Sequence, residues 1–409
     1  MRLAAVFALP LIAVSSLAAA EQPPAAPAYE VREVFSPDGR IERVRVPVAL
    51  ETSAAERSRA AAAATGVVPL QVSGPAETTF DLVVVGDGYT AAEQPVFHRH
   101  ASSKVDELFS IEPFRSYRGV FNVWLVEVVS AESGVDNDPL PGTSRDTVLD
   151  MQFWCNGTER LLCVNQSKAL AAAEELVPDV DHVLALGNSA KYGGAGGKVA
   201  TASGGHAKAG QVAIHELGHS IGKLADEYDS PYLIPHVGDA PEANATVYPE
   251  QVMVPQQLKW WRWFGQSTPD GGTIGSHLGG RYNPVVYYRP SANSIMRSLG
   301  REFNVVGREE MVLGFYELAR PLLTASPAAA ARRGATLRIT TPRVGTLRIT
   351  WSIDGRVVAR DVTELDLRTE AGPRGAFTVE VQVADTTPWV LPTHPRAELL
   401  VETASWQVG

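Results

Sequence analysis

The segment from Ile214 to Gly222 constrains this chain more than any other, because it carries two histidines four residues apart in an apolar stretch. His215 and His219 would project from one face of a helix and could bind one Zn²⁺ ion at about 2.0–2.1 Å from each nitrogen. Glu216 would lie beside this pair, within reach of a water molecule at the metal. The pattern predicts two metal ligands and a general base on one helical turn, which is typical of zinc-dependent peptidases.

The His-Glu-x-x-His motif alone is only moderately specific, since a polar helix with two surface histidines can carry it by chance. The residues around the motif argue for a buried helix instead. They are largely apolar: Val212, Ala213, Ile214, Leu217 and Ile221. A buried helix with His, Glu and His needs partners for these polar groups, and a metal ion satisfies them.

A catalytic zinc normally has three protein ligands, so a third must follow the motif. The downstream candidates are Asp226, Glu227, Asp229 and His236. A straight helix would place Asp226 about 10 Å beyond His219 at 1.5 Å per residue, so the chain must turn back. Gly222 can adopt a positive φ without steric cost, and we expect the helix to break there. The prediction is that Asp226 completes the site, with Glu227 second and His236 third.

The composition indicates a globular protein rather than a nucleic-acid-binding one. The chain has 409 residues, of which 45% are hydrophobic and 20% charged, enough for two or three domains. Acidic residues number 46 against 36 basic ones, a net charge of −10, so a basic face for nucleic acid is not expected. We expect a monomer whose partner is a protein or peptide substrate.

The first twenty residues have the features of a signal peptide. Arg2 supplies the positive start, an apolar run follows, and Ala18 to Ala20 offers a cleavage site. Pro10 interrupts this run, and no later stretch approaches the ~20 apolar residues of a membrane span. We therefore expect a secreted or periplasmic protein with no integral membrane segment after signal removal. In such a compartment Cys155 and Cys163 are expected to form a disulfide.

Beyond the signal peptide at 1–20, we expect three regions. Residues 21–75 would be a small N-terminal β module, or a propeptide that inhibits the enzyme until it is removed. Residues 76–325 would be an α/β (α+β) catalytic domain, because buried-strand patterns near 80–85, 120–129 and 182–186 alternate with helical ones. After a linker at 324–334, residues 335–409 alternate at period two and predict an all-β sandwich.

A glycine-rich run at 193–197 leads into a strand-like segment at 198–203, directly before the predicted metal-binding helix. A peptidase needs an exposed strand edge that holds an extended peptide by backbone hydrogen bonds. We therefore expect Val199 to Ala202 to be that edge.

The longer segment from His215 to Tyr228 closely resembles the signature of the bacterial IgA-peptidase family of zinc metallopeptidases. The resemblance covers about residues 76–320 and includes the segments 85–90, 130–134, 188–194 and 288–297. This family looks related to the metzincins, so the resemblance implies a metzincin-like fold, a helix that ends at Gly222 and a methionine, Met296, under the zinc. In metzincins the third ligand follows the glycine by three residues; here Ala225 stands at that position and Asp226 comes one residue later.

The predicted reaction is peptide-bond hydrolysis by a secreted zinc endopeptidase. Metal-activated water would attack the peptide carbonyl, and Glu216 would take its proton and deliver it to the leaving amine. By analogy with phenols near zinc in related peptidases, Tyr282, Tyr287 or Tyr288 could stabilise the oxyanion; each is also compatible with a structural role.

The alternative is an exported binding or adhesion protein, with a structural metal and a ligand-binding β-sandwich. A structural zinc normally has four protein ligands, often cysteines, and would leave Glu216 without a task. The sequence therefore favours the enzyme.

Overall fold

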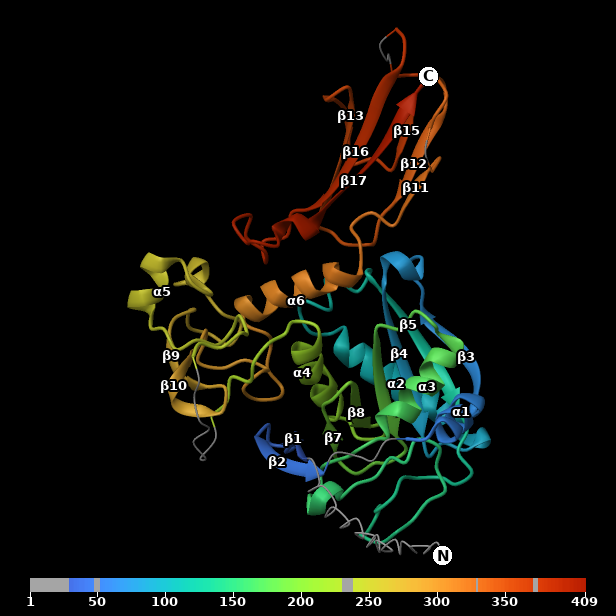
Figure 1. The fold of residues 1–409 in the computed structure, drawn as a ribbon, viewed down its shortest axis with the longest axis vertical. Helices are drawn as coiled ribbons and strands as arrows, with labels where there is room; N and C mark the ends of the chain where they lie inside the picture. Colours follow the sequence, from blue (N-terminus) through green and yellow to red (C-terminus); the bar gives the residue numbers. More distant parts are fainter. Residues whose placement is uncertain (1–28, 48–51, 230–237, 329, 371–373) are drawn as a thin grey trace, which may run out of the picture.

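The computed structural model describes residues 29–47, 52–229, 238–328, 330–370 and 374–409. The expected signal peptide and His236 lie outside these residues. Figure 1 shows a larger part of mixed helices and strands, and a smaller C-terminal part made mainly of strands. In the described part of the chain, no helix has the length and apolar character needed to cross a membrane.

The larger part is built around a six-stranded sheet with the order β3-β5-β4-β6-β8-β7. In chain order the strands are β3 (Ala64–Gln71), β4 (Phe80–Asp87), β5 (Phe121–Val128), β6 (His182–Gly187), β7 (Gly194–Ala195) and β8 (Val199–Ser203). The four inner strands are parallel, and β3 and β7 run antiparallel at the two edges. Every residue of β4 is buried, as its continuous apolar run predicts for an inner parallel strand.

The expected substrate-binding edge at Val199 to Ala202 is wrong. The short strand β7 covers β8, with Gly194 opposite Ala202, and all of β8 is buried. Glycine permits this close pairing, because a Cβ on Gly194 would lie 2.7 Å from the carbonyl oxygen of Thr201. The glycine-rich run itself therefore forms the edge of the sheet.

Helices cover both faces of this sheet. One face carries α1 (Ala54–Ala62) and α3 (Gln166–Leu176), which pack on alternate residues of β4 such as Val83 and Val85. The other carries α2 (Gln94–Leu108) and α4 (Gly210–Ser220), which pack on Leu82 and Val84 together with α6 (Val305–Leu318). A capping box between Thr90 and Glu93 precedes α2.

The sheet begins earlier in the chain than the boundary that we placed at residue 76. Strand β3 pairs with β5 from Ala64 onwards, and α1 contributes Ala60 to the core beneath α3. The remainder of the expected N-terminal module is a hairpin of β1 (Tyr29–Phe35) and β2 (Ile41–Pro47). In Figure 1 this hairpin lies beside β7, near the end of the central sheet.

The C-terminal part contains two antiparallel sheets. One has β11 (Thr324–Ser326), β12 (Thr336–Thr340) and β15 (Glu364–Asp366); the other has β13 (Leu347–Ile353), β14 (Arg356–Arg360), β16 (Phe377–Asp385) and β17 (Val401–Val408). The two sheets share one apolar core, in which Leu337 and Ile339 lie with Trp351, Val381 and Trp406. The expected linker at 324–334 therefore contains a strand, β11.

In chain order, α5 (Glu250–Gln256), β9 (His277–Gly280) and β10 (Asn283–Arg289) come between α4 and α6, and in Figure 1 they lie to one side of the central sheet. Cys155 and Cys163 form the expected disulfide, with their Cα atoms 6.3 Å apart.

Candidate metal centre

The helix α4 supports the predicted motif. Its residues Ile214 and Leu217 pack into the main apolar core, which leaves both histidines on another side of the helix. Val212 shares the side of the histidines and packs with Phe35. His215 is fully buried, and His219 lies one turn further along at the end of the helix.

The helix ends near Gly222 as expected, but for a different reason. The residue with positive φ is Lys223, at 50°, and the amide of Leu224 donates to the carbonyl of Gly218 at 3.2 Å. Gly222 is needed for close packing instead, since a Cβ there would lie 2.8 Å from the sulfur of Met311. The chain thus turns directly after the helix and returns toward the histidines.

Two backbone carbonyls fix the orientation of the imidazole rings. His215 Nδ1 lies 2.9 Å from the oxygen of Ile295, and His219 Nδ1 lies 2.7 Å from the oxygen of Leu224. A carbonyl oxygen only accepts hydrogen bonds, so each Nδ1 carries a proton. In the neutral ring the lone pair is then on Nε2, the state in which histidine binds a metal.

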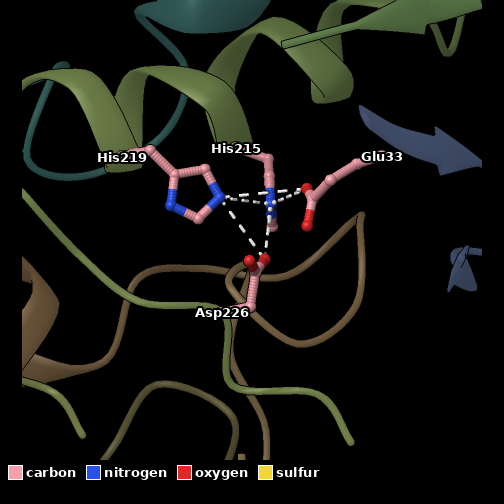
Figure 2. Close-up of side chains that lie close together, drawn as sticks. All are labelled: Glu33, His215, His219 and Asp226. Carbon is pink, nitrogen blue, oxygen red and sulfur yellow. Dashed lines mark hydrogen bonds and ion pairs between the residues drawn. The ribbon is translucent and has the colours of Figure 1, made fainter. Parts of the chain in front are cut away.

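The two Nε2 atoms and Asp226 meet at one point. The nitrogens are 3.1 Å apart, and Asp226 Oδ1 lies 3.2 Å from His215 Nε2 and 3.3 Å from His219 Nε2. Figure 2 shows these side chains pointing toward one another. The hydroxyl of Tyr282 donates to the other oxygen of Asp226, which orients the carboxylate.

Glu33 is a fourth member of this cluster that the sequence did not indicate. Its Oε2 lies 3.1 Å from His215 Nε2 and 3.8 Å from His219 Nε2 (Figure 2). The hydroxyl of Tyr228 donates to its other oxygen, Oε1. Glu33 belongs to β1 and stands 182 residues before His215, so no local spacing connects the two.

The donor set fits a metal cation. Two imidazole nitrogens and carboxylate oxygens, all within 4.8 Å of one another, are the ligands that Zn²⁺ prefers. Asp226 Oδ1 is buried and accepts no hydrogen bond from the residues that the structure describes, so a positive charge is a partner that suits it.

The electrostatics of the cluster favour a positive charge at the same point. Burial tends to lower the pKa of His215, but Asp226 and Glu33 outweigh it and raise the pKa to about 10. Burial likewise tends to raise the pKa of Asp226, but His219 and His215 hold it well below its usual value. The carboxylates therefore create a field that attracts either protons or a metal ion.

Glu216 stands next to the cluster without belonging to it. Its carboxylate is buried, and Oε1 has no hydrogen-bond partner among the described residues. Burial raises the pKa of Glu216 to about 7, and the neighbouring charge of Glu33 acts in the same direction. The carboxylate lies against the backbone of Gly196 in the glycine-rich run. A carboxylate with this pKa can accept and return a proton near neutral pH.

The turn around Met296 packs against the helix α4. Met296 is almost completely buried, and a Cβ on Gly218 would lie 2.5 Å from its sulfur. The preceding residue, Ile295, provides the carbonyl that orients His215. The methionine thus packs against α4 between the two histidines.

Glu227, the second choice for the third ligand, lies outside the cluster. Its carboxylate accepts hydrogen bonds from Ser294 at 2.8 Å, Asn304 at 2.9 Å and Asn244 at 3.1 Å. It joins the segment after the helix to the Met296 turn, a connection that the amide of Glu227 reinforces by donating to the Met296 carbonyl at 2.7 Å.

The tyrosines named from the sequence have different surroundings. Tyr282 contacts the cluster through Asp226, and Tyr287 lines the adjoining cavity. Tyr288 packs in an apolar cluster around Trp260, away from the donor atoms. Tyr228, which was not singled out for a role, contacts the cluster through Glu33.

A cavity of about 750 Å³ opens beside the cluster. The metal site contributes Glu216, His219 and Asp226 to its wall, and the hairpin contributes Arg32 and Arg43. The candidate substrate cleft is therefore bounded on one side by the N-terminal hairpin.

An α/β protein with this helix-borne donor set and a neighbouring carboxylate has the features of the metallopeptidase class. The sequence profile of the IgA Peptidase M64 family matches residues 68–270, which include His215, Glu216, His219 and Asp226 but not Glu33. The chain belongs to this IgA-peptidase family of metallopeptidases, which confirms the resemblance found in the sequence. No curated protein sequence matches the chain.

Proposed function

We propose that this protein is a secreted, zinc-dependent endopeptidase that hydrolyses peptide bonds with Glu216 as general base. One observation carries the proposal: His215, His219 and Asp226 converge on one point, and the unpaired carboxylate of Glu216 lies beside them. Family membership supports a protein substrate. The charge pattern and the apolar start of the chain support export and a substrate other than nucleic acid.

His215, His219 and Asp226 would hold the zinc ion. When bound, the ion supplies a Lewis acid that polarises a carbonyl group and makes water acidic near neutral pH. Glu216 accepts a proton from the attacking water and returns it to the leaving nitrogen, for which its pKa of about 7 is suited. Tyr228 and Tyr282 place hydroxyl groups around the cluster, and either could donate to a developing oxyanion once its proton turned away from the carboxylate that accepts it in this structure.

The finer features of the fold belong to the same proposal. The helix break after Ser220, the return of Asp226 and the Met296 turn support a metzincin-like catalytic domain. The shared core of the two C-terminal sheets supports a β-sandwich attached to it. We propose that the molecule acts as a monomer.

The decisive test is Glu216→Gln, assayed on casein and on a peptide library. Glu33 lies at the donor cluster and could affect the assay. The parent protein, Glu216→Gln and the control are therefore each prepared in two forms, one with Glu33 and one with Glu33→Gln. We expect Glu216→Gln to retain zinc and to lose at least about 100-fold in kcat, the contribution of a positioned base. Glu174 is exposed on α3, so Glu174→Gln is the matched control and should behave like the parent protein.

The same assay separates the enzyme from a binding protein with a structural metal. Hydrolysis that a zinc chelator abolishes and added zinc restores supports the peptidase. Undiminished hydrolysis by Glu216→Gln would remove Glu216 from the mechanism. If the protein binds zinc tightly but cleaves no substrate, either with Glu33 or with Glu33→Gln, the proposed peptidase function is refuted.

A further inference from the structure

The β1–β2 hairpin is docked firmly on the catalytic part of the molecule. Val34, Phe35 and Val46 are buried, and the ring of Phe35 lies edge-on to His215 with 5.3 Å between the ring centres. The backbone also takes part: Arg160 Nε donates to the Phe35 carbonyl at 3.0 Å. Among the described strands, β1 and β2 pair only with each other, so the hairpin can leave without removing a strand from the central sheet.

The hairpin lies along the edge where a substrate would bind. Strand β7 is the last strand of the sheet, and Val34 packs against its Ala195. The guanidinium of Arg32 donates to the carbonyl of Gly196, directly after β7. An extended peptide on this edge would need the same backbone groups. The hairpin and a substrate therefore compete for one place.

Glu33 reaches from this hairpin to the metal-binding atoms. A catalytic zinc keeps one coordination position open for water or substrate, whereas a zinc closed by four protein ligands is structural. His215, His219 and Asp226 account for three ligands, and Glu33 Oε2 is the fourth donor atom in the cluster. The Tyr228 hydroxyl donates to the other oxygen of Glu33 and so holds the carboxylate at the cluster.

We infer that the β1–β2 hairpin keeps the enzyme latent, with the Glu33 carboxylate taking the open position of the metal and β1 the place of the substrate. This inference rests on the proposed peptidase function. Activation then requires that the hairpin leave the cleft, after which the fourth position is free and the edge at Gly196 is exposed.

Charge makes this latch depend on the metal. Glu33 enters a site that already contains the carboxylates of Asp226 and Glu216, which repel it, and positive charge at His215 and His219, from protons or from a bound metal ion, offsets this repulsion. Metal binding and hairpin docking are therefore coupled, and each must strengthen the other by the same factor. This coupling can be measured without any assay of hydrolysis.

The test uses the full chain as wild type, Glu33→Gln and Glu42→Gln. Glu42 is the matched control, since it lies on the same hairpin with its side chain 60% exposed and 3.9 Å from Arg160. Three quantities are compared: the zinc dissociation constant by competition with a chromophoric chelator, the rate of tryptic cleavage after Arg43, and kcat/KM on a peptide library. Arg32→Gln serves as a second variant that keeps Glu33 and weakens docking at Gly196.

We expect Glu33→Gln to weaken zinc binding by about tenfold or more, to speed cleavage after Arg43, and to raise kcat/KM by at least about tenfold as the competent fraction grows. Arg32→Gln should show the faster cleavage and higher kcat/KM, and Glu42→Gln should match the wild type. Unchanged zinc affinity and tryptic rate in Glu33→Gln, with wild-type activity, would overturn the latch and leave the peptidase intact. Weakened zinc binding and a freed hairpin in a protein that cleaves nothing would instead support Glu33 as a ligand and refute the peptidase.

Discussion

Glu216 and Gly196 lie so close together that a Cβ on residue 196 would be 1.8 Å from Glu216 Oε2. The glycine run that forms the edge of the sheet thus also provides the space for the carboxylate that we propose as the general base. Such a contact involves the end of a flexible side chain, which can move at little cost in stability. Proton transfer, however, requires the Glu216 carboxylate at a well-defined position, so even a small displacement should slow it.

Gly196→Ala should therefore impair catalysis without unfolding the protein. We expect kcat to fall by about 100-fold, because a displacement of a reacting group by roughly 1 Å can reduce the rate by this factor. The zinc content and the urea midpoint should stay near those of the parent protein. Gly345→Ala is the control, because a Cβ there meets nothing within 4 Å. Full activity of Gly196→Ala would show that Glu216 tolerates displacement, which would contradict its proposed role as general base.

The choice of Asp226 over Glu227 as third ligand gives a second prediction. Asp226→Asn removes a charge that lies 3.2 Å from His215 Nε2, and should weaken zinc binding by at least about tenfold. Glu227→Gln disturbs the hydrogen bonds with Ser294 and Asn304 instead, and should lower the free energy of unfolding by about 1–3 kcal/mol while zinc affinity is kept. Chelator competition and urea unfolding of both variants measure the two effects. The reverse pattern would make Glu227 the ligand.

Local sequence patterns predicted the elements that carry the chemistry. The unbroken apolar run of β4 indicated an inner strand, and the apolar surroundings of His215 indicated a buried helix. The distance argument along the helix axis required a turn before Asp226, although the positive φ falls on Lys223 rather than on Gly222. These features depend on residues near one another in the chain.

Other features depend on tertiary contacts that no local pattern encodes. Strand β7 consists only of Gly194 and Ala195, which is too short for an alternating pattern of side chains. The sequence therefore placed the edge of the sheet at β8. Glu33 is one of two acidic residues in β1, and only the docking of the hairpin brings it to His215. The alternation of β1 predicted a strand but not its place in the cleft.

The packing of Met296 against Gly218 leads to a third prediction. Met296→Ala leaves a cavity under α4 and should lower the free energy of unfolding by about 2–5 kcal/mol. Met296→Leu conserves the volume and should lower it by less than about 1.5 kcal/mol. Urea unfolding with zinc present measures both. Equal stabilities of the two variants would show that the side chain does not fill the space beneath the helix.

The last prediction concerns pH and a histidine outside the metal centre. His182 begins β6 with its ring 5.2 Å from that of Phe80, and its Nδ1 is buried without a hydrogen bond to any described residue. Burial lowers the pKa of His182 to about 4, and the charge of Lys223 acts in the same direction. Between pH 6.5 and 4 the unfolded chain binds a proton that the folded chain refuses, so this residue's contribution to stability is lost as the pH falls. The effect reaches about 3 kcal/mol at 1.36 kcal/mol per pH unit.

The neighbouring Asp181 acts in the opposite sense. Burial raises its pKa to about 6, so its contribution is present below pH 3.8 and is lost as the pH rises toward 6. His182→Gln removes the contribution of His182 and leaves that of Asp181. The free energy of unfolding of the variant minus that of the wild type should therefore be more positive at pH 4.5 than at pH 6.5. Urea unfolding of both proteins in a metal chelator at the two pH values isolates this difference, because the other titrating groups are common to them. A difference that stays constant between pH 4.5 and 6.5 would mean that His182 titrates normally in the folded protein.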